Sequence, residues 1–146
     1  MKPTFVNIDS FNVSGLQVRT SNRNEFNPAT AKLPDLWQRF FAEAPDLPMF
    51  GVYSDYESNT EGLYTVTAGV KVDHSSNNTL KVLSGDYLVF EGQGSMPHAV
   101  VETWQRVWHY FEGKNKCQRC FKTDFDMYKG NEEIAIYIGV ELAPSA

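Results

Sequence analysis

The first half of the chain carries apolar residues at helical spacing. From position 33 onward they recur at i, i+3, i+4, i+7, i+8 and i+11, which predicts an amphipathic helix with one buried stripe: Leu33, Leu36, Trp37, Phe40, Phe41 and Ala44. Asn27 and Pro28 are the expected cap and first-turn proline of this helix. Pro45 and Pro48 are expected to end it, because proline does not continue a helix.

A second amphipathic helix is predicted from about Met96 to Phe111. Ser95 is its expected N-cap and Gly113 its expected stop. The buried stripe consists of Met96, Val100, Trp104, Val107, Trp108 and Phe111.

The remaining apolar segments are short and many of them alternate with polar residues, which is typical of strands. They predict strands over residues 4–19, 49–57, 63–72, 86–91, 121–128 and 133–142. Ser14 and Gly15 predict a bend or bulge in the first of these. Polar turns at 58–62 and 129–131 make two hairpins, and a loop at 73–79 separates the halves.

The two halves repeat one another. Three pairs of segments match at a spacing of about 70 residues: 36–39 with 103–106, 54–57 with 123–126, and 68–72 with 138–142. Each half reads strand, helix, strand, strand, so we expect an α+β fold with pseudo-twofold symmetry and an antiparallel sheet carrying two main helices. A single domain is expected over 1–146, with repeats at about 4–72 and 80–142. The seam between such halves is where a small-molecule pocket is expected.

Composition narrows the class of partner. The 146 residues are 42% hydrophobic and 14% aromatic, enough for one core, with rings to spare for a binding site. A net charge of −5 argues against direct binding of nucleic acid. No apolar run is long enough to span a membrane and no signal sequence opens the chain, so we expect a soluble, cytoplasmic protein.

Metal and thiol chemistry are not expected. Cys117 and Cys120 form one CxxC, which is either a redox pair, half of a zinc site or, as we expect, two reduced thiols on a loop before a strand. His74, His98 and His109 have no ligand-like spacing to them. We therefore predict no metal and no cofactor.

The candidate chemistry lies on the last hairpin. The strand period of two separates Phe125 from Asp126 and Tyr128, and on the next strand it separates Tyr137 from a row of isoleucines. If that row packs under the helices, the opposite face carries Asp126, Tyr128 and Tyr137, and the first repeat adds Tyr53, Asp55 and Glu57. Carboxylates among rings favour a flat or greasy cation. The alternative is that these acids solvate an exposed sheet face, with Asp55 and Asp124 as solvated strand or turn positions and the tryptophans as core.

The pattern resembles the GyrI-like, or AraC-type (bacterial transcription activator), effector-binding domain. The resemblance runs from about residue 4 to residue 142 and is carried by four segments: 36–40 (LWQRF), 53–58 (YSDYES), 64–70 (YTVTAGV) and 124–128 (DFDMY). It implies the tandem repeat fold. In that family the segment like 125–128 commonly reads Phe-Glu-x-Tyr, and its Glu faces cationic, lipophilic drugs. Asp126 holds this position here, and Glu57, as its counterpart in the other repeat, is expected to supplement it.

The resemblance also implies a function. Multidrug-responsive regulators join such domains to a DNA-binding helix-turn-helix region, which these 146 residues lack, so the chain resembles stand-alone members carried on integron cassettes. We expect it to bind amphipathic cations for effector sensing or sequestration, linked to transcription regulation, with a DNA-binding regulator or a second copy as protein partner. The expected ligand-binding residues are Asp126, Glu57, Tyr64, Trp104, Trp108, Tyr128 and Tyr137, and none is catalytic. The alternatives are a GyrI-like hydrolase of reactive electrophiles and a protein that inhibits a topoisomerase by direct interaction.

Overall fold

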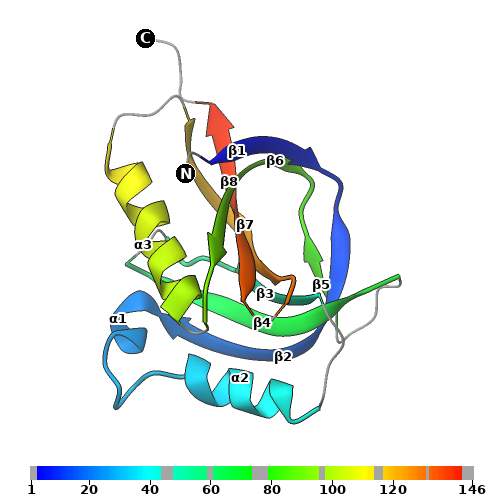
Figure 1. Cartoon of the computed structure of the whole chain (residues 1–146), viewed down its shortest axis with the longest axis vertical. Coiled ribbons are helices and arrows are strands. Elements are labelled where there is room, and N and C mark those ends of the chain that lie inside the picture. Colours follow the sequence, from blue (N-terminus) through cyan, green and yellow to red (C-terminus); the bar gives the residue numbers. More distant parts are fainter. Residues whose placement is uncertain are drawn as a thin grey trace.

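The fold is one eight-stranded antiparallel sheet with helices on its outside (Figure 1). It comes from a computed structural model that describes residues 3–43, 48–58, 61–73, 79–95, 98–113, 117–130 and 132–142. The strands are β1 (Thr4–Ile8), β2 (Phe11–Ser21), β3 (Met49–Ser54), β4 (Leu63–Val72), β5 (Thr79–Val82), β6 (Gly85–Gln93), β7 (Cys117–Tyr128) and β8 (Glu133–Leu142). The helices are α1 (Asn22–Glu25), α2 (Leu33–Phe41) and α3 (His98–Glu112).

The strand order confirms the predicted tandem repeat. It reads β1-β6-β8-β7-β3-β4-β2-β5, so β7 and β3, one from each half, pair at the centre. On either side of them the sequence of partners is the same: the hairpin strand (β8 or β4), the strand before the helix (β6 or β2), and a short edge strand. The two edge strands are exchanged, because β1 pairs with β6 and β5 pairs with β2.

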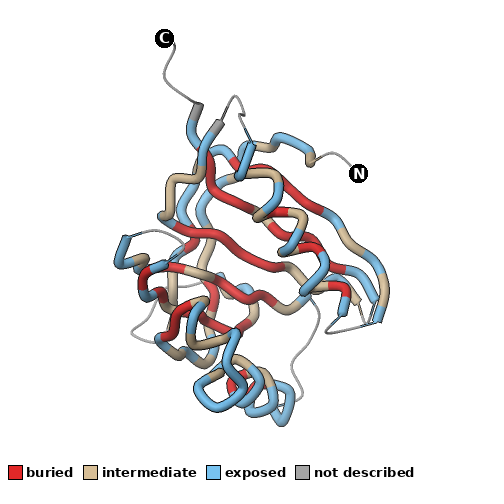
Figure 2. Tube along the Cα trace, turned by 90° about the vertical axis from the view of Figure 1, so that its left-hand side faces the viewer, coloured by how far each residue is buried: buried red, intermediate tan, exposed pale blue. Residues whose placement is uncertain are grey.

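This exchange curls the sheet on itself. Only Asp9 and Ser10 separate β1 from β2, although the two strands lie near opposite ends of the strand order. Side chains from both ends and from the centre therefore meet inside the curl, in a cluster of Val13, Phe50, Val52, Val82, Tyr87 and Phe125. Figure 2 shows the resulting runs of buried residues along the strands, with more exposed residues along the helices.

The predicted break in the first strand is misplaced. The strand breaks at Asp9 and Ser10, whereas β2 continues through Gly15, which pairs with Gly69 on β4. A Cβ at Gly15 would lie 1.8 Å from the carbonyl oxygen of Ala68. Glycine is needed here because the two backbones approach closely, and not because the strand ends.

The start of the first main helix was also predicted wrongly. α2 begins at Leu33, with Pro34 in its first turn, and the segment after Asn27 forms turns. The carboxylate of Glu25 accepts hydrogen bonds from the backbone N–H groups of Lys32 (2.9 Å) and Leu33 (3.0 Å). A side chain from the unpredicted helix α1 thus satisfies amide groups at the start of α2, where a negative charge is favourable.

The two main helices cover the outer face of the sheet. α2 buries Leu36 and Phe40 against Tyr64, Val66 and Ala68 of β4. α3 buries Ala99 and Val107 against a row of isoleucines on β8: Ile134, Ile136 and Ile138. The described part of the second stripe is buried or partly buried, as predicted. In the first stripe Phe41 is 52% exposed, so its predicted burial is wrong. Ala44, Pro45 and Met96 lie outside the described residues. None of the helices in these ranges is long and apolar enough to cross a membrane.

Candidate functional site

The acidic residues of β7 lie on the helix-bearing face of the sheet. Asp126 pairs with Ile136, and Tyr128 pairs with Ile134. Directly opposed residues in an antiparallel pair share a face, so both lie on the side of the isoleucine row, under the helices. The prediction that they occupy the face away from this row is wrong. Tyr137 does lie on that other face, where its ring stacks on Phe125 at 4.4 Å between centroids.

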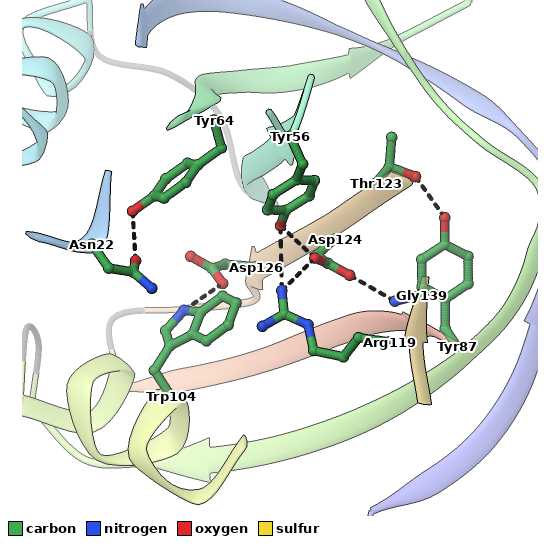
Figure 3. A network of polar contacts seen from close by, with 10 residues as sticks. All are labelled: Asn22, Tyr56, Tyr64, Tyr87, Trp104, Arg119, Thr123, Asp124, Asp126 and Gly139. Atoms are coloured by element: carbon green, nitrogen blue, oxygen red, sulfur yellow. Dashed lines mark hydrogen bonds and ion pairs between the residues drawn. The ribbon is translucent and has the colours of Figure 1, made fainter. Parts of the chain in front are cut away.

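Asp126 is buried at the seam between the halves. Its side chain is 1% exposed, with Oδ1 accepting from Trp104 Nε1 and Oδ2 accepting from Tyr53 Oη, both at 3.1 Å (Figure 3 shows the Trp104 contact). Burial raises the pKa of Asp126 to about 7, although the two donors act in the opposite direction. This carboxyl group therefore changes its charge near neutral pH.

Aromatic rings surround this carboxyl group on the outer face. Trp37 of α2 lies over Gly51, the β3 residue that pairs with Asp126, and contacts Tyr128 at 5.1 Å between ring centroids. Trp104 of α3 lies 5.1 Å from Tyr53. Farther out, Trp108 lies 6.1 Å from Trp104 and Tyr64 lies 5.7 Å from Tyr53. The matched tryptophans of the two repeats thus come from different helices to the same seam.

A second buried carboxylate, Asp124, has its own counter-charge. Arg119 Nη2 lies 2.8 Å from Oδ2, the Gly139 N–H donates to Oδ1 at 2.7 Å, and the Tyr56 hydroxyl also donates to Oδ2 (Figure 3). Both charged side chains are at most 7% exposed. The prediction that Asp124 is a solvated strand or turn position is wrong. By contrast, Asp126 forms no ion pair within the described part of the chain.

The first repeat does not supply a matching acid. β4 and β8 correspond residue for residue, and Val66 pairs with Tyr53 as Ile136 pairs with Asp126, so Tyr53 is the structural equivalent of Asp126. Glu57 corresponds to Lys129 instead, since the backbone N–H groups of Glu57 and Lys129 bond to the equivalent carbonyl oxygens of Leu63 and Glu133.

The two repeats differ in the length of this hairpin. Tyr53 and its partner Val66 lie 13 residues apart in the sequence, whereas Asp126 and its partner Ile136 lie 10 residues apart. A constant offset in sequence therefore does not carry Glu57 onto Asp126. Glu57 lies beyond the end of β3 with its side chain exposed, as does Asp55. Cys117 and Cys120 belong to strand β7, so the prediction that they lie on a loop before a strand is also wrong.

The predicted site residues therefore divide into two groups. One face carries Asp126, Trp104, Trp108, Tyr64 and Tyr128, whereas Glu57 and Tyr137 lie elsewhere. Two residues that we left out of the predicted set, Trp37 and Tyr53, are at the centre of this face. The signal for Trp37 was its match to Trp104 in the repeat. We refer below to the outer-face site, defined as Asp126, Trp37, Tyr53, Trp104 and Tyr128.

Metal ligands are not grouped anywhere in the ranges that the structure describes. No three or more His, Cys, Asp or Glu side chains there are placed to hold an ion. Cys120 carries a free thiol. His98 and His109 lie exposed on α3, and His74 falls outside the described residues.

Comparison with known proteins gives consistent matches over almost the whole chain. The family Cass2, described as integron-associated effector binding protein, matches residues 4–140. The integron cassette protein VCH_CASS2 of Vibrio cholerae is 35% identical, with a TM-score of 0.86 and coverage of 96% of both chains. The putative transcriptional regulator YobU of Bacillus subtilis (strain 168) is 25% identical over 92% of this chain and 94% of its own length.

A more distant structure shows the same fold with a ligand. SAV2435, solved bound to tetraphenylphosphonium, is 20% identical, with a TM-score of 0.74 and coverage of 97% of this chain and 94% of its own. At this level of identity the likeness establishes the fold alone.

Proposed function

The chain belongs to the family of integron-associated effector binding proteins, and from this premise we propose that it binds amphipathic, lipophilic cations at the outer-face site. The observation that carries the proposal is Asp126, a carboxyl group 1% exposed that has hydrogen-bond donors and surrounding rings. The biological role that we propose is effector sensing or sequestration.

Charge is the first argument. A buried carboxylate is costly without a compensating cation, and the two buried acids of β7 differ in this respect. Arg119 neutralises Asp124 from within the chain, whereas Asp126 forms no such pair among the described residues. A bound cation would supply the missing charge. It would also favour ionised Asp126 over the neutral form that a pKa of about 7 allows.

The rings are the second argument. The ring centroids of Trp37 and Tyr128 lie 5.1 Å apart, and those of Tyr53 and Trp104 also lie 5.1 Å apart. These rings give the site large apolar surfaces. A cation over an aromatic face gains on the order of 0.5 to 2 kcal/mol, most over tryptophan. A guest that combines a positive charge with apolar groups therefore fits both features.

The relatives support the same class of ligand and a regulatory context. Tetraphenylphosphonium, found with SAV2435, is a cation whose charge is surrounded by aromatic rings. YobU is described as a putative transcriptional regulator. We propose that a DNA-binding partner links ligand binding to transcription.

The test is calorimetric titration with tetraphenylphosphonium at pH 8, where Asp126 is largely ionised. We expect Asp126→Asn to lower the affinity about tenfold or more, because the counter-charge is lost. Glu57→Gln is the matched control, since it removes the same charge from an exposed position. Equal affinity of the parent and Asp126→Asn would reject the charge assignment, and absence of binding to the parent would reject the ligand class.

A further inference from the structure

Asp126 can offer a cation its charge, but its oxygens are already engaged as hydrogen-bond acceptors. We propose that the outer-face site selects aprotic cations, such as quaternary ammonium and phosphonium ions, over protonated amines of the same shape. This inference rests on the proposed function and specifies its ligand class. It follows from where each donor and acceptor on this face is directed.

Both carboxylate oxygens of Asp126 receive a donor from the protein. Trp104 Nε1 donates a hydrogen bond to Oδ1 and Tyr53 Oη donates one to Oδ2, each at 3.1 Å. The approach to Oδ2 from β3 is also restricted. A Cβ at Gly51 would lie 3.3 Å from Oδ2 and 2.9 Å from Trp37 Cζ2, so the indole ring already fills the space that this glycine leaves.

The neighbouring polar groups do not replace these acceptors. Asp124 receives donors from Arg119, Gly139 and Tyr56. The Tyr64 hydroxyl is directed to Asn22 Oδ1 at 2.8 Å, away from Asp126 (Figure 3). Tyr128 adds a hydroxyl on this face, but a neutral hydroxyl is a weaker partner for an ammonium N–H than a carboxylate is.

A protonated amine therefore meets a poor match at this site. Each carboxylate oxygen could accept a second hydrogen bond, but Asp126 is 1% exposed, so its remaining lone pairs are covered by the packed side chains around it. The N–H of the amine must therefore either displace Trp104 or Tyr53 from the carboxylate, which leaves a buried donor unpaired, or enter the site without a strong acceptor. An aprotic cation has no such donor, and it interacts with the carboxylate through charge and with the rings through their faces. The expected preference is about tenfold or more, as for other buried donors left unsatisfied.

The experiment compares two compounds that differ at one position: a tertiary amine carrying a diarylmethyl group, and its N-methylated quaternary derivative. Calorimetric titration is done at a pH where the amine is fully protonated, so both carry one positive charge. The added methyl group contributes some affinity by itself. The preference is therefore measured in the parent and in Tyr53→Phe, where Oδ2 becomes free to accept from the amine. Tyr137→Phe is the matched control, because it removes the same hydroxyl from the inner face.

We expect the quaternary compound to bind about tenfold more tightly than the amine in the parent and in Tyr137→Phe, and this ratio to shrink in Tyr53→Phe. Equal affinity of the two compounds for the parent, or tighter binding of the amine, would overturn the inference while leaving the proposed function intact. A ratio that does not change in Tyr53→Phe would also overturn it. Absence of binding by both compounds would overturn the proposed function and this inference together.

Discussion

Tyr53 and Asp126 occupy equivalent positions in the two halves of the sheet, and the Tyr53 hydroxyl donates to Asp126 Oδ2 across the pseudo-twofold axis at 3.1 Å. The duplicated fold therefore places one phenol and one acid at its centre. Two buried acids at these positions would repel each other and share a proton. The asymmetric pair gives the site one carboxyl group that can ionise, and under the function proposed above this group would face a cation with a single positive charge.

The position of Asp126 predicts a pH-dependent cost in stability. Burial raises its pKa from the ordinary value of 3.8 to about 7 in the folded protein, which corresponds to roughly 4 kcal/mol against ionisation. The folded state thus binds the proton more tightly than the unfolded state, so this group lowers stability as pH rises from about 4 to about 7. Asp126→Asn removes that loss.

Urea unfolding at pH 4 and pH 8 measures this effect. The stability of Asp126→Asn relative to the parent is expected to be higher at pH 8 than at pH 4, by about 1 to 4 kcal/mol, since the amide does not ionise. Glu57→Gln is expected to show no comparable change, because its side chain is exposed. The same difference between Asp126→Asn and the parent at both pH values would contradict the raised pKa.

The ion pair of Arg119 and Asp124, beside the outer-face site, is expected to contribute to stability. Arg119→Met leaves Asp124 charged and buried without a cation, at a cost of about 3 to 5 kcal/mol in the free energy of unfolding. Adding Asp124→Asn to this variant should recover part of the loss. Arg39→Met is the control, because its pair with Asp35 is 52% and 72% exposed and is worth about 1 kcal/mol or less. Similar losses in both single variants would contradict this account.

Periodicity was enough to predict the fold but not the faces of β7. The repeat, the hairpins, α3 and β8 follow from spacing that the sequence displays directly, and strict alternation defined the isoleucine row. The lengths of the two hairpins leave no such trace: Tyr53 and its partner Val66 lie 13 residues apart, whereas Asp126 and its partner Ile136 lie 10 apart. This difference is the reason that the sequence offset paired Asp126 with Glu57, whereas the structure makes Tyr53 its equivalent.

The partners of buried polar groups were also beyond the sequence. Asp124 looked like a solvated strand residue because alternation does not reveal that Arg119, five positions earlier, turns back onto it. The start of α2 depends on Glu25, which lies eight residues before Leu33 and reaches it only through the fold. Trp37 was assigned to the core by its helical stripe, and its position over Gly51 depends on how α2 crosses the sheet.

Gly51 is expected to be a sensitive position in the site. An added Cβ would lie 2.9 Å from Trp37 Cζ2, closer than packed atoms normally approach, so Gly51→Ala must displace the indole ring. We expect a loss of about 1 to 3 kcal/mol in stability and a weaker affinity for tetraphenylphosphonium. In Gly130→Ala the new Cβ meets nothing within 4 Å, which makes it the matched control. Unchanged affinity in Gly51→Ala would argue that Trp37 does not border the ligand.

Trp104 and Trp108 lie one turn apart on α3, and only Trp104 donates to Asp126. Tetraphenylphosphonium has no titratable group, so its affinity should follow the ionisation of Asp126 and fall as pH drops below about 7. Trp104→Phe removes a donor that lowers the pKa of Asp126, so we expect the midpoint of this pH dependence to move to higher pH. Trp108→Phe should weaken binding, if at all, equally at every pH. Calorimetric titration from pH 6 to pH 8 distinguishes the two variants, and parallel pH profiles for all three proteins would show that the Trp104 hydrogen bond does not set the charge of the site.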